Sequence, residues 1–159
     1  MSRYRPNVAL ILTRSDGRLL VCERVDYGGS WQFPQGGVKE GETNEDALAR
    51  EVREEVSLSP VDYRILCQKG PYRYRFRPGI RKEGCDGQEQ VYFLARVEES
   101  SLDMIRVDRE EFRRFRWVTP GEFRLEWVPP IKREVYKAVF RDFFNVAIEG
   151  SEGVANDSY

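Results

Sequence analysis

Residues 50–56 read Arg-Glu-Val-Arg-Glu-Glu-Val and place three glutamates, Glu51, Glu54 and Glu55, within about one and a half helical turns. Like charges at these spacings repel one another on an isolated helix. The stretch therefore predicts one of two things. Either water and the neighbouring arginines screen an acidic helix face, or the carboxylates hold positive charge between them.

The sequence around this stretch predicts a helix over residues 43–56, because Leu48, Val52 and Val56 recur every four residues. On a helical projection with Leu48 at zero, Val52 and Val56 fall within about 80° of it. The three glutamates fall between about 240° and 340° on the same projection. They are therefore expected at the edge of the buried stripe, where water screens their repulsion less.

Apolar runs separated by turn residues predict strands on both sides of this helix, over residues 7–13, 19–23, 31–33, 63–69, 72–76, 90–97 and 115–118. A second amphipathic helix is predicted over residues 131–148. This order predicts an α+β fold, an α/β/α sandwich. We expect one domain over residues 1–148 and a flexible polar tail over residues 149–159.

Composition excludes several classes of chemistry. The 159 residues contain no histidine, which excludes Ser-His-Asp triads, Cys-His pairs and histidine-based zinc sites. The three cysteines form no CxxC pair, and Cys22 and Cys67, which lie in apolar stretches, are expected to be buried. No apolar run has membrane-spanning length and the N-terminus lacks signal-peptide features, so a cytoplasmic location is expected.

Converging carboxylates in a chain without histidine suit Mg²⁺ or Mn²⁺, which prefer oxygen ligands. A glycine-rich turn with a further acid precedes the helix, and its spacing is specific. Gly36 is followed after five residues by Glu42, and Glu42 is followed after seven residues by the stretch 50–58. This pattern resembles the Nudix box at every position except Ser57, where the family usually has glycine.

The resemblance implies a mixed sheet between helices, with the box forming a loop, a helix and a loop. It implies that Glu51, Glu54 and Glu55 hold two or more Mg²⁺ or Mn²⁺ ions, with Glu54 a candidate for the base that assists water. It also implies that Arg50 positions Glu51. The remaining supporting residues implied by the box are Gly36, Gly37 and Glu42.

Segments outside the box resemble one branch of the family, the bacterial RNA pyrophosphohydrolases and asymmetric dinucleoside tetraphosphate hydrolases. These segments are residues 4–8, 31–37, 111–118 and 132–136. The branch implies that Glu111 is a further metal ligand or the base. It also implies contacts to substrate phosphates from Arg5, Tyr74 and Lys132.

The implied activity is removal of phosphates from the 5′-triphosphate end of RNA to leave a 5′-monophosphate. Asymmetric cleavage of diadenosine tetraphosphate into ATP and AMP is the alternative, and a non-catalytic module that binds RNA or nucleotides is a more remote one. Residues 73–82 concentrate arginine beside aromatic residues, which suits phosphates and stacked bases. A basic strand face balanced by nearby acids explains them equally well. The oligomeric state and any activating partner stay open.

Overall fold

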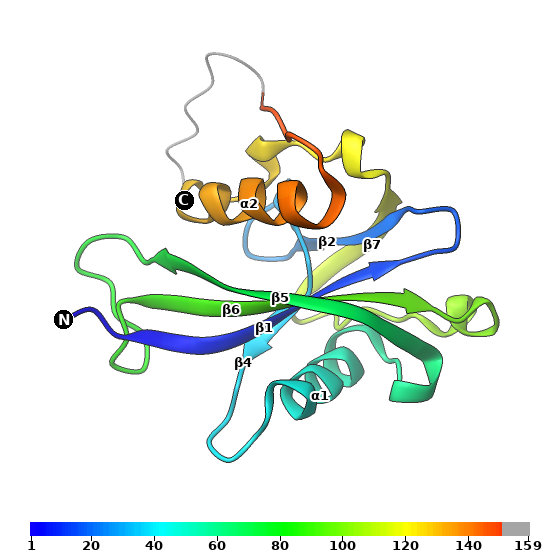
Figure 1. Cartoon of the computed structure of the whole chain (residues 1–159), viewed down its shortest axis with the longest axis horizontal. Helices are drawn as coiled ribbons and strands as arrows, with labels where there is room; N and C mark the ends of the chain where they lie inside the picture. Colours follow the sequence, from blue (N-terminus) through cyan, green and yellow to red (C-terminus); the bar gives the residue numbers. More distant parts are fainter. Residues whose placement is uncertain (151–159) are drawn as a thin grey trace.

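A mixed seven-stranded sheet forms the centre of the computed structural model, which describes residues 1–150 (Figure 1). Five strands follow the order β3-β2-β1-β6-β5, while β4 pairs with β1 and β7 pairs with β2. Strands β1 and β6 run parallel, and all the other pairs are antiparallel. The strands are β1 Tyr4–Thr13, β2 Leu19–Arg24, β3 Trp31–Gln32, β4 Gln35–Gly37, β5 Tyr63–Arg75, β6 Gly87–Val97 and β7 Phe112–Val118.

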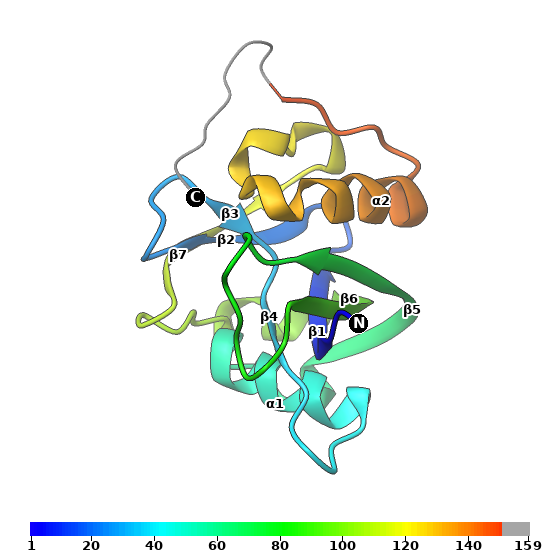
Figure 2. The ribbon, with the colours of Figure 1, turned by 90° about the vertical axis from the view of Figure 1, so that its left-hand side faces the viewer.

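Two helices cover the sheet from opposite sides, α1 (Asn44–Val56) from one and α2 (Arg133–Phe144) from the other (Figures 1 and 2). Side chains alternate along β1, so Val8 and Leu10 pack in the cluster that contains α1. Ala9 and Ile11 pack in the cluster that contains α2. The predicted sandwich of a mixed sheet between helices is confirmed.

The ends of α1 explain why the helix covers this stretch. The Thr43 hydroxyl accepts from the backbone N–H of Asp46 at 3.1 Å, and the Asp46 carboxylate accepts from the backbone N–H of Thr43 at 3.3 Å. Ser57 ends the helix with φ of 66°, at the position where the Nudix box has glycine. A left-handed conformation costs a non-glycine residue about 1 kcal/mol. The Ser57 hydroxyl donates to the backbone oxygen of Arg106 at 2.9 Å and offsets part of that cost.

Strand β5 differs from the prediction of two strands, because Tyr63–Arg75 pairs with β6 along its whole length. The interruption seen in the sequence is a register shift between Lys69 and Tyr72, around Pro71, which has no N–H for the ladder. The prediction that Cys67 is buried is wrong, because β5 is the edge strand of the sheet and Cys67 is exposed on it. Cys22 is buried, as predicted.

Helix α2 is shorter at both ends than the predicted 131–148. Residues Pro130–Lys132 form a 3₁₀ turn before it, and Asn145 ends it in the left-handed conformation with φ of 53°. The predicted tail falls outside the described residues except for Glu149 and Gly150, and the Glu149 carbonyl accepts from the backbone N–H of Leu125. Within residues 1–150, none of the helices combines the length and apolarity needed to cross a membrane.

Candidate functional site

A cavity of about 660 Å³ opens between α1, the β5–β6 loop and the turn before α2. Its lining contains residues from most of the sheet, which converge only after folding. The acidic residues of the lining are Asp26, Glu51, Glu54, Glu55, Asp108 and Glu111. The basic ones are Arg5, Arg24, Arg77, Lys82 and Lys132. One cavity therefore combines carboxylates with cations, as binding of a metal and a polyanion requires.

The three glutamates of α1 lie at the edge of the buried stripe, where the projection predicted them. The Glu55 residue is 7% exposed and the Glu51 side chain 14%, whereas the Glu54 side chain is 55% exposed. All three line the cavity.

Arg50 ties the loop before α1 to this helix. Its guanidinium donates to both carboxylate oxygens of Glu42 at 2.8 and 2.9 Å and to the backbone oxygen of Gly37 at 2.8 Å. The same group donates to Oε1 of Glu51 at 2.7 Å. The hydrogen bonds from Arg50 and from the backbone N–H of Lys39 hold the pKa of Glu42 at about 2. Arg50 therefore fixes the Glu51 carboxylate relative to β4 and the loop that follows it. The sequence predicted a turn at Gly36 and Gly37, but both residues lie in β4 because they pair with β1.

Burial raises the pKa of the Glu51 and Glu55 carboxyl groups above the usual value. The Glu51 carboxylate raises the pKa of Glu55 further, and Glu111 adds to this effect. The buried Oε2 of Glu55 has no hydrogen-bond partner among the described residues. Two buried carboxyl groups one helical turn apart, with one oxygen lacking a hydrogen-bond partner in the part of the chain that the structure describes, form a place where a divalent cation can bind.

The residues present therefore fit a divalent ion, but they do not form a preassembled cage. Within residues 1–150, no three acidic, cysteine or histidine side chains are already gathered around one point. Glu54 lies 3.6 Å from Arg50 and is directed partly to solvent.

Glu111, the residue directly before β7 and far from α1 in the sequence, lines the same cavity. Its carboxylate lies 3.7 Å from the guanidinium of Arg24, which also donates to both oxygens of Asp26 at 2.9 and 3.0 Å. The neighbouring Glu110 is exposed and lies outside the cavity lining. The geometry thus places Glu111, the residue that the resemblance singled out, in the cavity lining and leaves its neighbour Glu110 outside it.

The three residues predicted to contact phosphates all line the cavity. Arg5 carries a buried Nε without a hydrogen-bond partner among residues 1–150, and Tyr74 accepts from the Gln88 amide at 2.8 Å. Lys132 donates to Oε1 of Gln32 at 2.6 Å. Burial, followed by the charges of Arg24 and Lys82, lowers the pKa of Lys132 to about 7.

Several polar residues of the cavity lining were not predicted from the sequence: Asn7, Arg24, Asp26, Gln32, Gln35, Gln88 and Asp108. Asn7 and Gln32 are each 2% exposed although they lie within apolar strands. A buried amide in an apolar strand needs hydrogen-bond partners, and the Gln90 amide supplies one by donating to Asn7 at 3.0 Å. Amide residues inside otherwise apolar strands are thus the sequence signal that could have identified this part of the cavity lining.

Comparisons with known proteins agree with this geometry. The NUDIX domain model matches residues 3–139. The RNA pyrophosphohydrolase of Teredinibacter turnerae is 41% identical over 145 residues, covering 87% of this chain and 84% of that protein. The RNA pyrophosphohydrolase of Edwardsiella ictaluri is 38% identical, covering 96% of this chain and 89% of that protein.

Two solved structures share the fold at lower identity. The Ap4A hydrolase binary complex from C. elegans has a TM-score of 0.63 at 22% identity and covers 87% of this chain and 94% of that chain. The dihydroneopterin triphosphate pyrophosphohydrolase of E. coli has a TM-score of 0.65 at 19% identity, covering 89% and 97%. The domain match and the close relatives confirm the resemblance seen in the sequence, and the chain belongs to the Nudix family of hydrolases, which act on phosphoric anhydride bonds.

Proposed function

We propose that this protein removes phosphates from the 5′-triphosphate end of RNA and leaves a 5′-monophosphate. The observation that carries the proposal is the cavity that holds the carboxylates of α1 together with Arg5 and Lys132. A 5′-triphosphate needs both features, because its charge must be neutralised before a water molecule can attack phosphorus. Relatives about 40% identical over most of the chain carry the name RNA pyrophosphohydrolase, which favours RNA as the substrate.

Divalent metal ions are general in the Nudix family. In this chain, Glu51, Glu54, Glu55 and Glu111 would hold Mg²⁺ or Mn²⁺, as two or more ions. When bound, such ions supply charge neutralisation and lower the pKa of a bound water. The buried carboxyl groups of Glu51 and Glu55, one helical turn apart in the cavity lining, and the unpartnered Oε2 of Glu55 support this assignment.

The chain's own residues then have separate roles. Arg50 keeps Glu51 in place through the 2.7 Å hydrogen bond, and Glu42 and Gly37 hold Arg50 in turn. Glu54 and Glu111 are the most exposed of the four cavity glutamates, so either can accept a proton from water.

Arg5, Tyr74 and Lys132 are proposed to bind the phosphates. The buried Arg5 Nε has a free hydrogen to donate. A polyanion near Lys132 favours the charged ammonium, because an opposite charge raises a lysine pKa. Substrate binding would thus reverse the effect of burial on Lys132.

The experiment that tests the proposal compares kcat/KM on three substrates in Mg²⁺: 5′-triphosphorylated RNA, diadenosine tetraphosphate and free nucleoside triphosphates. We expect the highest kcat/KM on RNA, with a 5′-monophosphate end as product. Preferred cleavage of diadenosine tetraphosphate into ATP and AMP would replace the proposal with the alternative activity. A protein that only binds RNA or nucleotides would yield no product from any of the three. A cytoplasmic location, where new RNA 5′ ends are available, is proposed together with this activity.

A further inference from the structure

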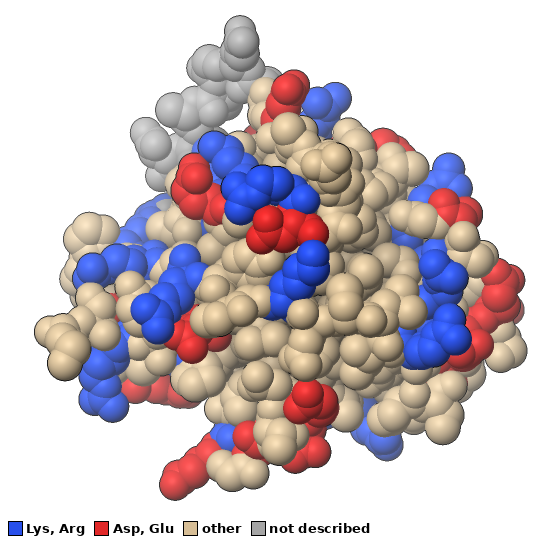
Figure 3. Space-filling view, in the orientation of Figure 1, with Lys and Arg blue, Asp and Glu red and all other residues tan. Residues whose placement is uncertain are grey.

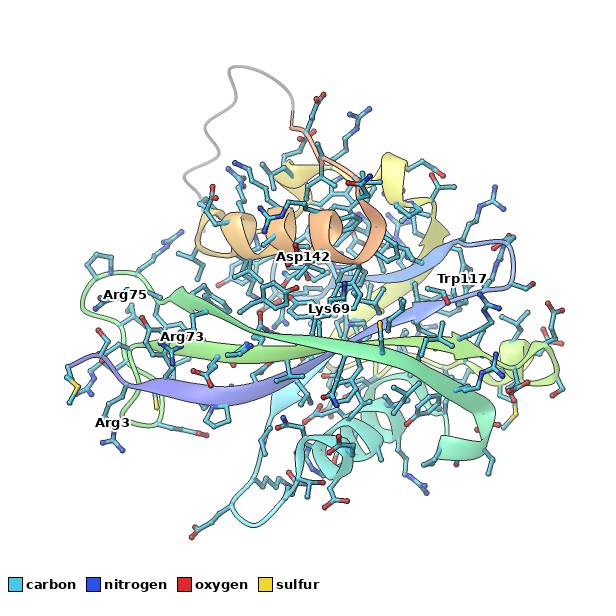
Figure 4. All side chains as sticks on the ribbon, viewed as in Figure 1. Arg3, Lys69, Arg73, Arg75, Trp117 and Asp142 are labelled. Carbon is cyan, nitrogen blue, oxygen red and sulfur yellow. The ribbon has the colours of Figure 1, made fainter. Side chains whose placement is uncertain are left out.

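A strongly basic surface lies beside the cavity, at the end of the sheet where β1 begins and β5 ends. Figure 3 shows Lys and Arg side chains gathered over this end, at the left of the view. Figure 4 places Arg3, Arg73 and Arg75 there, on β5 and on the segment before β1. We call it the β5-end surface, and its exposed cations are Arg3, Arg73, Arg75, Arg77, Arg81 and Lys82.

Nearby acids compensate only part of this charge. Glu89 pairs with Arg73 at 2.7 Å, and Asp86 pairs with Arg81 at 3.1 Å. The third acid, Glu83, lies 3.5 Å from Arg5 in the cavity. The remaining four cations have no ion-pair partner among residues 1–150: Arg3, Arg75, Arg77 and Lys82. The surface therefore keeps a net positive charge. Of these four cations, Lys82 also places its ammonium over the Phe76 ring, at 5.2 Å.

The β5-end surface is continuous with the cavity. Arg77 and Lys82 belong to both, because they also line the cavity. Side chains alternate along β5, so Tyr74 is buried on the cavity side while its neighbour Arg75 is exposed. Tyr4 and Arg75 both pair with Gly87 from opposite sides, which places their backbones about 10 Å apart across the sheet. Because Arg3 directly precedes Tyr4, Arg3 and Arg75 both lie on the outer part of the surface.

We propose that the β5-end surface binds the phosphodiester backbone of the RNA downstream of its 5′-terminal nucleotides, an inference that rests on the proposed function. An RNA whose triphosphate occupies the cavity carries its following phosphates past Arg77 and Lys82 to Arg3 and Arg75. Arginines at this spacing suit a flexible single strand, which needs neither shape complementarity nor an apolar interface. A nucleoside triphosphate ends within the cavity and does not reach the outer pair.

Arg3 and Arg75 permit a clean test, since neither lines the cavity and neither side chain makes a hydrogen bond among the described residues. The variant is R3A/R75A. Its matched control is R64A/R96A, because Arg64 and Arg96 face each other at the far end of β5 and β6 and are likewise exposed. The substrates are a 5′-triphosphorylated dinucleotide and an unstructured 12-nucleotide RNA with the same 5′ sequence.

We expect R3A/R75A to lower kcat/KM on the 12-nucleotide RNA by about tenfold, mainly through KM, and to leave the dinucleotide within about twofold. The logarithmic salt dependence of kcat/KM on the longer RNA should become less steep by about 1.4, because each phosphate contact on a single strand contributes about 0.7. The control R64A/R96A should match the parent on both substrates. Substrate-length dependence separates this effect from a general loss of structure.

Equal rates of R3A/R75A and R64A/R96A on the longer RNA would overturn the inference and leave the proposed function intact. An equal loss on both substrates would overturn it too, because it would place the two arginines in the reaction itself. A parent protein that cleaves neither RNA would refute the proposed function, and the inference would fall with it.

Discussion

The carboxyl group of Glu51 occupies the space that a side chain at Gly36 would need. A Cβ added at Gly36 would lie 2.0 Å from Cδ of Glu51, far inside van der Waals contact. The absence of a side chain at Gly36 in β4 therefore leaves the space in which the Glu51 carboxylate of α1 lies.

Gly36→Ala should displace the Glu51 carboxylate and lower kcat by about tenfold or more, with little loss of thermal stability. The backbone of Gly36 is compatible with alanine, so the cost falls on the side chain that must move. Gly121→Ala, at a position where an added Cβ meets only open space, is the matched control and should keep parental kcat and melting temperature. Parental kcat in Gly36→Ala would show that the position of Glu51 is not critical.

Arg50→Lys should lower kcat by about tenfold or more. The planar guanidinium donates to Glu42, Gly37 and Glu51 at once, and a lysine ammonium cannot reproduce that geometry. The exposed Arg53 on the same helix provides the control, and Arg53→Lys should behave like the parent. Steady-state kinetics with a urea unfolding curve for each variant separates positioning from stability. An unchanged kcat in Arg50→Lys would remove the positioning role.

Lys132→Met should change stability in a pH-dependent way. Burial lowers the pKa of Lys132 to about 7 in the folded protein, below the ordinary value of 10.5. Between these two pKa values the unfolded state binds more protons at this site than the folded state. The parent's free energy of unfolding therefore increases as pH rises from about 7 to 10.5. The free energy of unfolding of Lys132→Met, minus that of the parent, should therefore be most positive near pH 7 and decrease toward pH 10. Urea unfolding at pH 7, 8, 9 and 10 measures it, and a difference independent of pH would contradict the assignment.

Glu111→Ala should lower kcat by about tenfold or more with a smaller effect on KM, because we propose that this carboxylate acts on the reacting centre more than on substrate binding. Glu110→Ala is an unusually close control, since Glu110 is the adjacent residue and lies outside the cavity lining. An effect of Glu111→Ala on KM alone would move this glutamate to substrate binding.

The periodicity of apolar residues was sufficient to predict α1 and the side on which its glutamates lie. On a helix, the spacing of two residues in the sequence fixes the angle between their side chains. It was not sufficient for β5, where Pro71 marks an irregularity within one strand rather than the end of it. Exposure of Cys67 depends on β5 being the edge strand, which only the pairing order reveals. The amide side chains of the cavity lining were also missed because they depend on strand pairing. Asn7 and Gln90 become neighbours only through the parallel pairing of β1 with β6.

The central claim is that the buried acids of α1 hold the divalent ions that hydrolysis requires. Its most direct test is the rate at which Glu55→Gln hydrolyses 5′-triphosphorylated RNA in saturating Mg²⁺, since this change keeps the shape of a side chain that is 7% exposed and removes its charge. We predict a loss in kcat of about 1,000-fold or more, with an unfolding midpoint no lower than that of the parent. A Glu55→Gln protein that turns over within about tenfold of the parent would contradict the account.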